Sequence, residues 1–469
     1  MRPGRLRALL EPLTVAVVLI SLLLVEGACW AGPAAEQGLR RKVATLLGPL
    51  VENDMVSGTI LISRGESEEY CQGFGPANRD HGIPNSCDTP FRIASISKSL
   101  TAVAILQLAD RGLLALDDPV ARFLPDYPQG DRIRVRHLLT HSSGLPSTPF
   151  IPGYEDKSRQ EHDLEQSLEW IRDQSPKFEP GERFEYSNTG YILLSAIIEK
   201  ASGMTFESYM DTRVFARAGM TRSGLDSWKR IVPGRATGYS RNGHGEVERA
   251  AGRNPRSCFG CGAFFATAPD LLRFMRALLR GELISKEAMS KMWSPLYETP
   301  WGDQYGLGWF IRQDRDRYEI SARGGTSGFM SRLTYFPRRE IIVVALLNQD
   351  FMLHTELFEA LSAIALGGEA GPVLSTAVKD LGEHPLARFL GEYEMEDGAH
   401  LRFVLDDSGF FLEENPSNRF RVFPVDEHTG FAAEPNARLV FEPGPDENSV
   451  SLRAFYGVLL WRGERVARN

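Results

Sequence analysis

Basic charge, cysteine and long apolar runs are all scarce in this sequence. Lysine and arginine number 53 against 61 aspartates and glutamates, which leaves a net charge of −8. A protein that neutralises nucleic-acid phosphates needs the opposite balance, so we expect no nucleic-acid partner. After an apolar run at 13–25, no segment approaches the ~20 apolar residues of a membrane-spanning helix. The 469 residues otherwise have a globular composition and predict two or three domains.

The first 31 residues have the organisation of a secretory signal peptide. Three arginines precede the apolar run 13–25, and the small residues of 27–35 follow it. We therefore predict a signal peptide at 1–31 and a secreted or periplasmic protein. The alternative is an anchor that is retained, in which case the N-terminal segment is where the protein meets a membrane.

The five cysteines include Cys29, which lies in the predicted signal peptide, and four others: Cys71, Cys87, Cys258 and Cys261. An even number in an exported protein favours disulfides, and four cysteines allow three connectivities. We expect the two shortest loops, Cys71–Cys87 and Cys258–Cys261. A zinc site would need paired C-x-x-C motifs, which are lacking. A redox role for 258-CFGC-261 is disfavoured because no βαβ pattern surrounds it.

Residues 36–366 read as one α/β unit in which strands flank a helical middle. The expected helices are 36–53, 99–112 and 352–366, and the expected strands are 57–65, 67–75, 318–322, 331–337 and 340–348. The simplest packing places the first and last strands in one antiparallel sheet, with the terminal helices on one face. The middle helices would then form a second lobe, and a cleft would lie between the two.

A second unit is predicted at 385–469, after a linker at 367–384. Short apolar runs separated by turn residues indicate a small antiparallel β domain, either a barrel or a sandwich. The runs are 401–405, 409–413, 419–424, 438–443, 451–456 and 458–463. Glu392, Glu394 and His400 are interpreted as solvated strand residues, because they form no catalytic pattern.

Ser95 and Lys98, in 91-FRIASISKSL-100, are the first candidate catalytic pair. Three residues apart, they share one face if a helix begins near Ser95. Lysine can activate a serine only when burial or nearby positive charge lowers its pKa. Lys98 is the only lysine of the chain with a serine three positions before it. Alone the motif is weak, since a random chain of this length contains such a spacing once or twice.

Two further segments could join that pair. Tyr186-Ser187-Asn188 is the only Tyr-x-Asn of the chain, and its phenol could relay a proton while its amide holds a lysine or a substrate carbonyl. The alternative is a purely structural role, in which the tyrosine ring packs in a loop and the asparagine caps the next helix. The glycine cluster in 321-SARGGTSGF-329 could lend backbone N–H groups to an oxyanion, or it could simply be a tight turn.

Other catalytic classes have no support in the sequence. It contains no H-E-x-x-H, no G-x-S-x-G and no phosphate-binding loop motif. His141 is the best histidine for a catalytic triad. Without an elbow serine to serve, it is interpreted as a structural loop residue.

Taken in order, six segments resemble the serine β-lactamase-like hydrolases, a family of class C β-lactamases, D,D-peptidases and related esterases. They are 91-FRIASISKSLTA-102, 133-IRVRHLLTHSSGL-145, 179-EPGERFEYSNTGYILLSAIIEKASGM-204, 235-RATGYS-240, 305-YGLGW-309 and 324-GGTSGF-329. The resemblance covers about 50–350. It implies a sheet lobe and a helical lobe with the site between them, and no metal or organic cofactor. The C-terminal domain resembles the lipocalin-like modules attached to some of these enzymes.

The resemblance assigns roles to the matching residues. Ser95 would be the acylating nucleophile, Lys98 its base, and Tyr186 a second base that promotes deacylation. Asn188 would be a hydrogen-bonding third member. The oxyanion hole would combine the N–H of Ser95 with that of Gly325. The implied reaction is acyl transfer through an acyl-enzyme on a small-molecule or peptide ester or amide.

The chain departs from the family pattern at the third motif. The usual Lys-Thr-Gly or His-x-Gly falls on Ala322-Arg323-Gly324, so the cation or imidazole that commonly holds a substrate carboxylate is missing. Arg323 points the other way on a regular strand. Gly324 and the backbone groups are kept. We therefore expect an esterase or amidase of uncharged substrates. The alternatives are a binding or scaffold protein on a weakened hydrolase fold, and a membrane-held carrier of the C-terminal module.

Overall fold

The computed structural model describes most of the chain from residue 33 onwards. The described residues are 33–52, 54–242, 246–315, 317–350, 354–370, 386–396, 398–406, 409–415, 418–424, 427–432, 437–446, 449–456 and 458–467. The predicted signal peptide with Cys29 lies outside them, as does most of the predicted linker. Within the described part of the chain, no helix has both the length and the apolar character that a membrane crossing requires.

An antiparallel sheet of eight strands is the frame of the first unit. Its strand order is β10-β11-β12-β13-β14-β15-β1-β2. The bounds are β1 Gly58–Arg64, β2 Ser67–Phe74, β10 Tyr297–Glu298, β11 Gln304–Tyr305, β12 Phe310–Gln313, β13 Tyr318–Thr326, β14 Phe329–Phe336 and β15 Ile341–Leu347. Strand β1 pairs with β15 along its whole length. The predicted meeting of the first and last strands in one sheet is thus confirmed.

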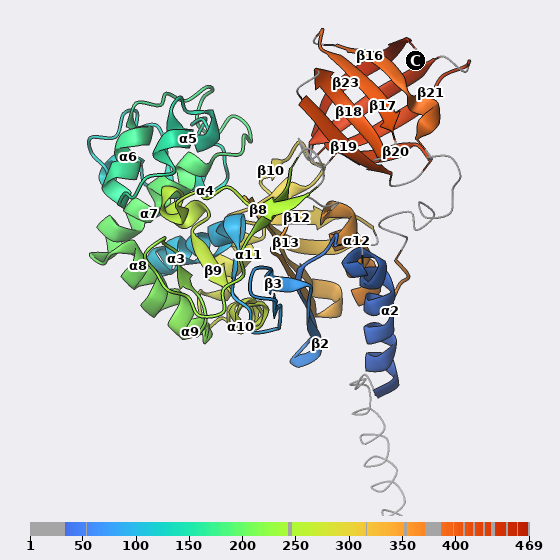
Figure 1. Cartoon of the computed structure of the whole chain (residues 1–469). Helices are drawn as coiled ribbons and strands as arrows, with labels where there is room; N and C mark the ends of the chain where they lie inside the picture. Colours follow the sequence, from blue (N-terminus) through green and yellow to red (C-terminus); the bar gives the residue numbers. More distant parts are fainter. Residues whose placement is uncertain are drawn as a thin grey trace, which may run out of the picture.

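Both faces of this sheet are covered, because successive side chains of a strand point to opposite sides. On β1, Ile60 and Ile62 pack against the terminal helices α2 (Pro33–Glu52) and α12 (His354–Ala365). Leu61, between them, belongs to the larger core on the other face. Figure 1 shows α2 and α12 side by side on their face of the sheet. The terminal helices therefore close one face and leave the other to the middle of the chain.

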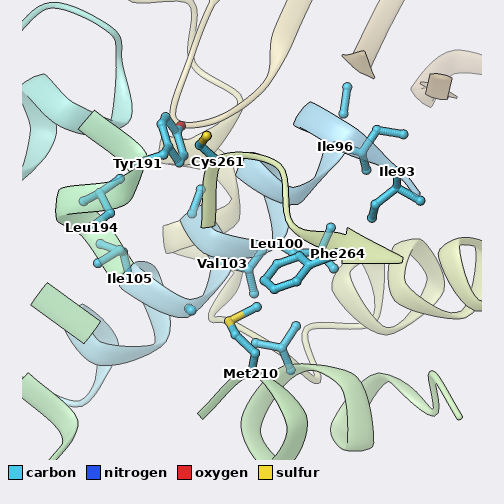
Figure 2. Packing of buried hydrophobic residues seen from close by; sticks show 14 of the residues in the cluster. Ile93, Ile96, Leu100, Val103, Ile105, Tyr191, Leu194, Met210, Cys261 and Phe264 are labelled. Atoms are coloured by element: carbon cyan, nitrogen blue, oxygen red, sulfur yellow. The ribbon is translucent and has the colours of Figure 1, made fainter. Parts of the chain in front are cut away.

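Helix α3 (Ser97–Asp110) runs through the centre of the larger core. All its residues from Ser97 to Leu108 are buried, which explains why its sequence is apolar nearly all round. Figure 2 shows Leu100 and Val103 of α3 turned towards Phe264 and Met210. A helix enclosed on every side is rigid, and the residues at its N-terminal end are held in place by the same packing.

Shorter elements surround α3. The helices are α4 Val135–Leu139, α5 Tyr154–Lys157, α6 Leu164–Arg172, α7 Asn188–Ser202, α8 Phe206–Tyr209, α9 Ala216–Ala218, α10 Ala268–Leu279 and α11 Lys286–Met292. The small sheets pair β3 Pro76–Asn78 with β4 Ile83–Pro84, β5 Phe91–Arg92 and β6 Gly224–Leu225 with β9 Phe264–Ala266, and β7 Tyr239–Arg241 with β8 Val247–Arg249. One disulfide joins Cys71 to Cys87, and the other joins Cys258 to Cys261.

The C-terminal strands close into an antiparallel barrel, which decides between the barrel and the sandwich. The strands are β16 Gly391–Met395, β17 His400–Asp406, β18 Gly409–Asn415, β19 Asn418–Pro424, β20 Thr429–Ala432, β21 Ala437–Pro443, β22 Val450–Tyr456 and β23 Val458–Ala467. The pairing of β16 with β23 closes it (Figure 1). The aromatic rings of Phe389, Tyr393, Phe403 and Phe441 lie in its core.

Two barrel strands, β16 and β20, were absent from the predicted apolar runs, although Glu392 and Glu394 of β16 were interpreted as strand residues. Both strands are short, and in β16 buried and exposed residues alternate over only five positions. Glu392 and Glu394 are the exposed members of β16, and His400 at the start of β17 is exposed as well. Their interpretation as solvated strand residues agrees with this exposure.

The packing of β1 predicts a strong difference between two leucine truncations. Leu61 is fully buried, whereas the side chain of Leu296 is 50% exposed. Leu61→Ala leaves a cavity in the core and should lower the free energy of unfolding by about 2–5 kcal/mol. Leu296→Ala is the matched control and should change it by less than about 0.5 kcal/mol. Urea unfolding followed by tryptophan fluorescence measures both, and equal losses would contradict this packing.

Candidate active site

Ser95 lies in a tight turn in front of α3. The turn is a 3-10 helix, Ala94–Ile96, and the α-helix begins two residues after Ser95. Ala94 has φ 44°, a left-handed conformation that costs a non-glycine residue energy. Ser331 of β14 donates a hydrogen bond of 2.8 Å to the carbonyl of Ile93 and so fixes the turn against the sheet. Ser95 itself is half-buried, whereas Ala94 and Ile96 are buried.

Lys98 is buried behind Ser95, with 2% of its surface exposed. Its Nζ lies 3.0 Å from Ser95 Oγ, 2.8 Å from Asn188 Oδ1 and 2.7 Å from the carbonyl oxygen of Cys261. None of these three partners is charged. Burial lowers the pKa of Lys98 well below its usual value, because removing an amine from water disfavours its charged form. The shift favours the neutral amine, which could donate its two N–H groups to the amide and carbonyl oxygens and accept a hydrogen bond from the Ser95 hydroxyl.

Tyr186 reaches Ser95 from the other direction. Its hydroxyl donates to Ser95 Oγ at 2.9 Å, and its ring centroid lies 4.8 Å from the Lys98 Nζ. Burial raises the pKa of Tyr186 to about 12, although the hydrogen bond with Ser95 opposes the shift. The phenol is therefore protonated at neutral pH. Of the two readings of this tyrosine, the structure favours a hydroxyl aimed at Ser95 over a ring that only packs.

Asn188 is the first residue of α7, and its side chain does not cap that helix. Its Oδ1 accepts the hydrogen bond from Lys98, and its backbone N–H donates to Ser147 Oγ at 3.0 Å. Thr189 Oγ1 donates to the carbonyl of Pro146 at 2.7 Å. The loop 139–147 thus holds the start of α7 and, with it, the amide that faces Lys98.

The same loop carries His141, which lies against Tyr186. The side chain of His141 is 1% exposed, and its ring centroid lies 4.3 Å from that of Tyr186. Burial lowers the pKa of His141 well below its usual value, and a protonated Lys98 lowers it further. It is a buried loop residue, as interpreted from the sequence, and its neighbours are the site residues.

Strand β13 passes close to the turn that carries Ser95. A side chain at Gly324 would collide with the carbonyl oxygen of Ile93, and its Cβ would lie 3.0 Å from the backbone nitrogen of Ser95. Only glycine allows this approach. Gly325 follows and is exposed. Both predicted glycines therefore lie on the strand segment nearest to the serine turn.

Ala322 and Arg323 occupy the positions of the third motif, and neither supplies a free cation or an imidazole to the site. Ala322 is buried and lies opposite Leu333 of β14. Arg323 forms an ion pair with Asp303, which is 4% exposed on its side chain, and its guanidinium lies 4.6 Å from the ring centroid of Phe310. The charge of Arg323 is thus compensated by Asp303, so this arginine does not replace the missing cation.

Two contributors to the site could not be identified from the sequence. One is the carbonyl of Cys261, a backbone group that any residue could supply. The other is the clamp that the loop 139–147 places on residues 185–191, which depends on tertiary contacts. The sequence pointed only to the loop 139–147, because the stretch 133–145 was already among the segments that carry the family resemblance.

Comparisons with known proteins agree with this geometry. The family model described as Beta-lactamase matches residues 39–365. Penicillin-binding protein 4* of Bacillus subtilis (strain 168) is 29% identical over 444 residues, which cover 88% of this chain and 95% of that protein.

Two solved structures extend the likeness to three dimensions. A penicillin binding protein from Bacillus halodurans has a TM-score of 0.60 at 31% identity, covering 67% of this chain and 98% of its own. An octameric penicillin-binding protein homologue from Pyrococcus abyssi has a TM-score of 0.66 at 25% identity, covering 91% of this chain and 100% of its own. With this match over most of its length, the chain belongs to the beta-lactamase family of serine hydrolases.

Proposed function

We propose that this protein cleaves an uncharged ester or amide through a covalent acyl-enzyme on Ser95. The observation that carries the proposal is the pair of hydrogen bonds on one atom. Ser95 Oγ lies 3.0 Å from Lys98 Nζ, the proposed acceptor of its proton, and accepts a hydrogen bond from the Tyr186 hydroxyl at 2.9 Å. A nucleophile that contacts both a neutral amine and a neutral phenol can lose a proton to one group while the other supplies a proton elsewhere.

In the acylation step, Lys98 takes the proton of Ser95 as Oγ attacks the carbonyl carbon. Tyr186 then gives its proton to the departing alcohol or amine, since its raised pKa keeps it protonated until that moment. The C–O or C–N bond breaks and the Ser95 ester forms. At this point Lys98 is charged and Tyr186 is a phenolate, and the nearby ammonium stabilises that phenolate.

In the deacylation step, the phenolate of Tyr186 takes a proton from water, which attacks the ester carbonyl. Ser95 Oγ leaves and recovers its proton from Lys98, so both groups return to their neutral starting states. The backbone N–H groups of Ser95 and Gly325 are the proposed oxyanion hole in both steps, with Gly324 allowing the close approach. Asn188 orients Lys98 through its 2.8 Å contact.

The proposed substrate class follows from the charges around the site. Ala322 supplies no cation, and Arg323 is already paired with Asp303. A substrate carboxylate would therefore lose its usual partner at this position. Trp301 is 36% exposed and packs edge-on to the ring of Tyr186, at 6.3 Å between centroids. An exposed indole beside Tyr186, which contacts the reacting serine, favours an apolar or aromatic acyl group.

The cellular setting is proposed from the sequence and the cysteines. A signal peptide at 1–31 would deliver the protein to an oxidising compartment, where the two disulfides are stable. Residues 36–366 would then be the catalytic domain and 385–469 a separate β domain, joined by the linker 367–384.

The disulfide Cys258–Cys261 is proposed to support Lys98. It closes the short 3-10 turn Phe259–Cys261, and the carbonyl of the last residue of that turn is 2.7 Å from Lys98 Nζ. Inside the loop, Gly260 N–H donates to Ser195 Oγ at 3.0 Å, and Thr101 Oγ1 donates to the carbonyl of Gly260 at 2.9 Å. The loop is therefore tied to both α3 and α7, and the disulfide fixes its ends.

The proposal is tested by covalent labelling and a substrate panel. A fluorophosphonate probe should add to Ser95, and p-nitrophenyl esters or D-amino-acid amides should be turned over. Ser95→Ala should abolish both, and Lys98→Ala should lower kcat/KM by about 10²–10⁴-fold. Mass spectrometry locates the adduct. An unlabelled Ser95 in folded wild-type protein, with no turnover across the panel, would instead support a binding role for this fold.

The pH dependence of kcat/KM is a second test. Lys98 must be neutral to accept a proton, so its lowered pKa moves the rising limb to a midpoint well below the ~10.4 of ordinary lysine. Tyr186 must be protonated to donate, so the falling limb should lie above ~10, the usual tyrosine value. In Tyr186→Phe, the rising limb should remain in place. A rising midpoint near that of a free lysine would refute Lys98 as the base.

The disulfide loop gives a third test, with an internal control. Replacing both Cys258 and Cys261 by serine should lower kcat/KM by as much as a hundredfold, because misplacing a catalytic group by about 1 Å has that effect. The matched control replaces Cys71 and Cys87, which should reduce stability by about 2–4 kcal/mol with kcat/KM retained. The role assigned to the loop fails if the two double variants lose the same activity.

A further inference from the structure

We infer that His141 is a positioning residue for Tyr186, and that it acts mainly on deacylation. The inference rests on the proposed function and goes beyond it. Two hydrogen bonds of His141 flank the tyrosine. Its carbonyl accepts the N–H of Glu185 at 2.8 Å, and its Nδ1 accepts the N–H of Ser187 at 3.1 Å. The residues before and after Tyr186 are thus held by one side chain and its own backbone.

The imidazole ring adds a third contact, to the phenol itself. It is tilted 34° to the ring of Tyr186, with centroids 4.3 Å apart. The rings of Tyr305, Tyr191 and Phe184 surround it at 5.0, 5.2 and 5.6 Å. A ring enclosed in this way cannot rotate without displacing its neighbours, so it limits the rotation of Tyr186 as well.

Two features of His141 cost free energy of folding: its backbone conformation and an unpaired ring nitrogen. His141 has φ 56°, in the left-handed region. Since Nδ1 accepts a hydrogen bond, the proton of the neutral ring is on Nε2, and Nε2 is buried without a hydrogen-bond partner among the described residues. An unpaired buried donor costs about 1–3 kcal/mol. Costs of this kind concentrate where function requires a particular geometry.

His141 does not exchange protons in this account. Burial lowers the pKa of His141, and the charge that Lys98 gains during acylation lowers it further. A neutral ring beside that ammonium avoids a repulsion that a protonated ring would create. The ring is therefore an inert support, and its effect passes through Tyr186.

Deacylation is the step that needs this support most. Before acylation, Tyr186 is also held by its 2.9 Å hydrogen bond to Ser95 Oγ. In the acyl-enzyme that oxygen is part of an ester, and Tyr186 is a phenolate with no proton to donate to it. The phenolate must now direct a water molecule. With the contact to Ser95 weakened, the contacts from His141 decide where the Tyr186 oxygen lies.

The test separates the two steps in full-length protein. Two variants divide the contacts: His141→Asn tolerates the left-handed backbone and offers an acceptor to Ser187 but has no ring, whereas His141→Phe keeps a ring and loses the acceptor. Stopped-flow acylation and deacylation rates are measured with a p-nitrophenyl ester. Both variants should slow deacylation about tenfold or more and acylation less than about threefold, so that acyl-Ser95 accumulates and is seen by mass spectrometry.

Two comparisons complete the experiment. His162→Asn changes another buried histidine, one that contacts Trp170 and the carbonyl of Gln160, and should leave both rates unchanged. In a Tyr186→Phe background, His141→Asn should have no further effect on deacylation, since its effect passes through the phenol hydroxyl. Equal losses in both steps, or an undiminished effect in that background, would overturn the inference. Absence of any acyl-Ser95 in the wild type would instead overturn the proposed function.

Discussion

The buried amine of Lys98 is the interaction around which the catalytic unit is arranged. Its Nζ joins three segments that are far apart in the sequence, through Ser95 Oγ, Asn188 Oδ1 and the carbonyl of Cys261. Burying a charged amine without a carboxylate costs several kcal/mol, whereas a neutral amine with satisfied hydrogen bonds does not. The amine makes all three hydrogen-bond contacts only if α3, α7 and the disulfide loop come together around Nζ. The same burial lowers the pKa of Lys98 and so favours the neutral form that the proposed mechanism requires.

Backbone strain is concentrated around that amine. Among the described residues six non-glycine positions have a left-handed φ, and Ala94, His141 and Phe259 are three of them. Each belongs to a segment that supplies or supports a hydrogen bond at Ser95 or Lys98. The energy that these conformations cost is offset by the large core on α3, so the rigidity of a buried helix is what allows a strained serine turn. Stability and catalysis are linked here through one packed element.

Residue types and spacing predicted the parts of the site that depend on side-chain chemistry. Ser95, Lys98, Tyr186 and Asn188 were all named from short motifs, and the structure brings them together. The carbonyl of Cys261 could not be named, because a backbone group leaves no mark in the sequence. The ion pair of Arg323 with Asp303 could not be predicted either, since it joins strand β13 to the loop before β11. The short barrel strands β16 and β20 were absent from the predicted apolar runs because alternation over four or five residues is too brief to stand out, and for β16 only Glu392 and Glu394 were interpreted as strand residues.

The central claim is that Lys98 is uncharged when the enzyme meets its substrate, and direct titration of that amine tests it. Selective labelling of lysine with 13C at Cε and 15N at Nζ gives one resonance per side chain, and Lys98→Arg assigns the signal of interest. The account predicts that this signal titrates well below the ~10.4 of ordinary lysine, whereas exposed lysines such as Lys291 keep the usual value as the internal reference. A Lys98 signal that titrates together with the exposed lysines would contradict the account.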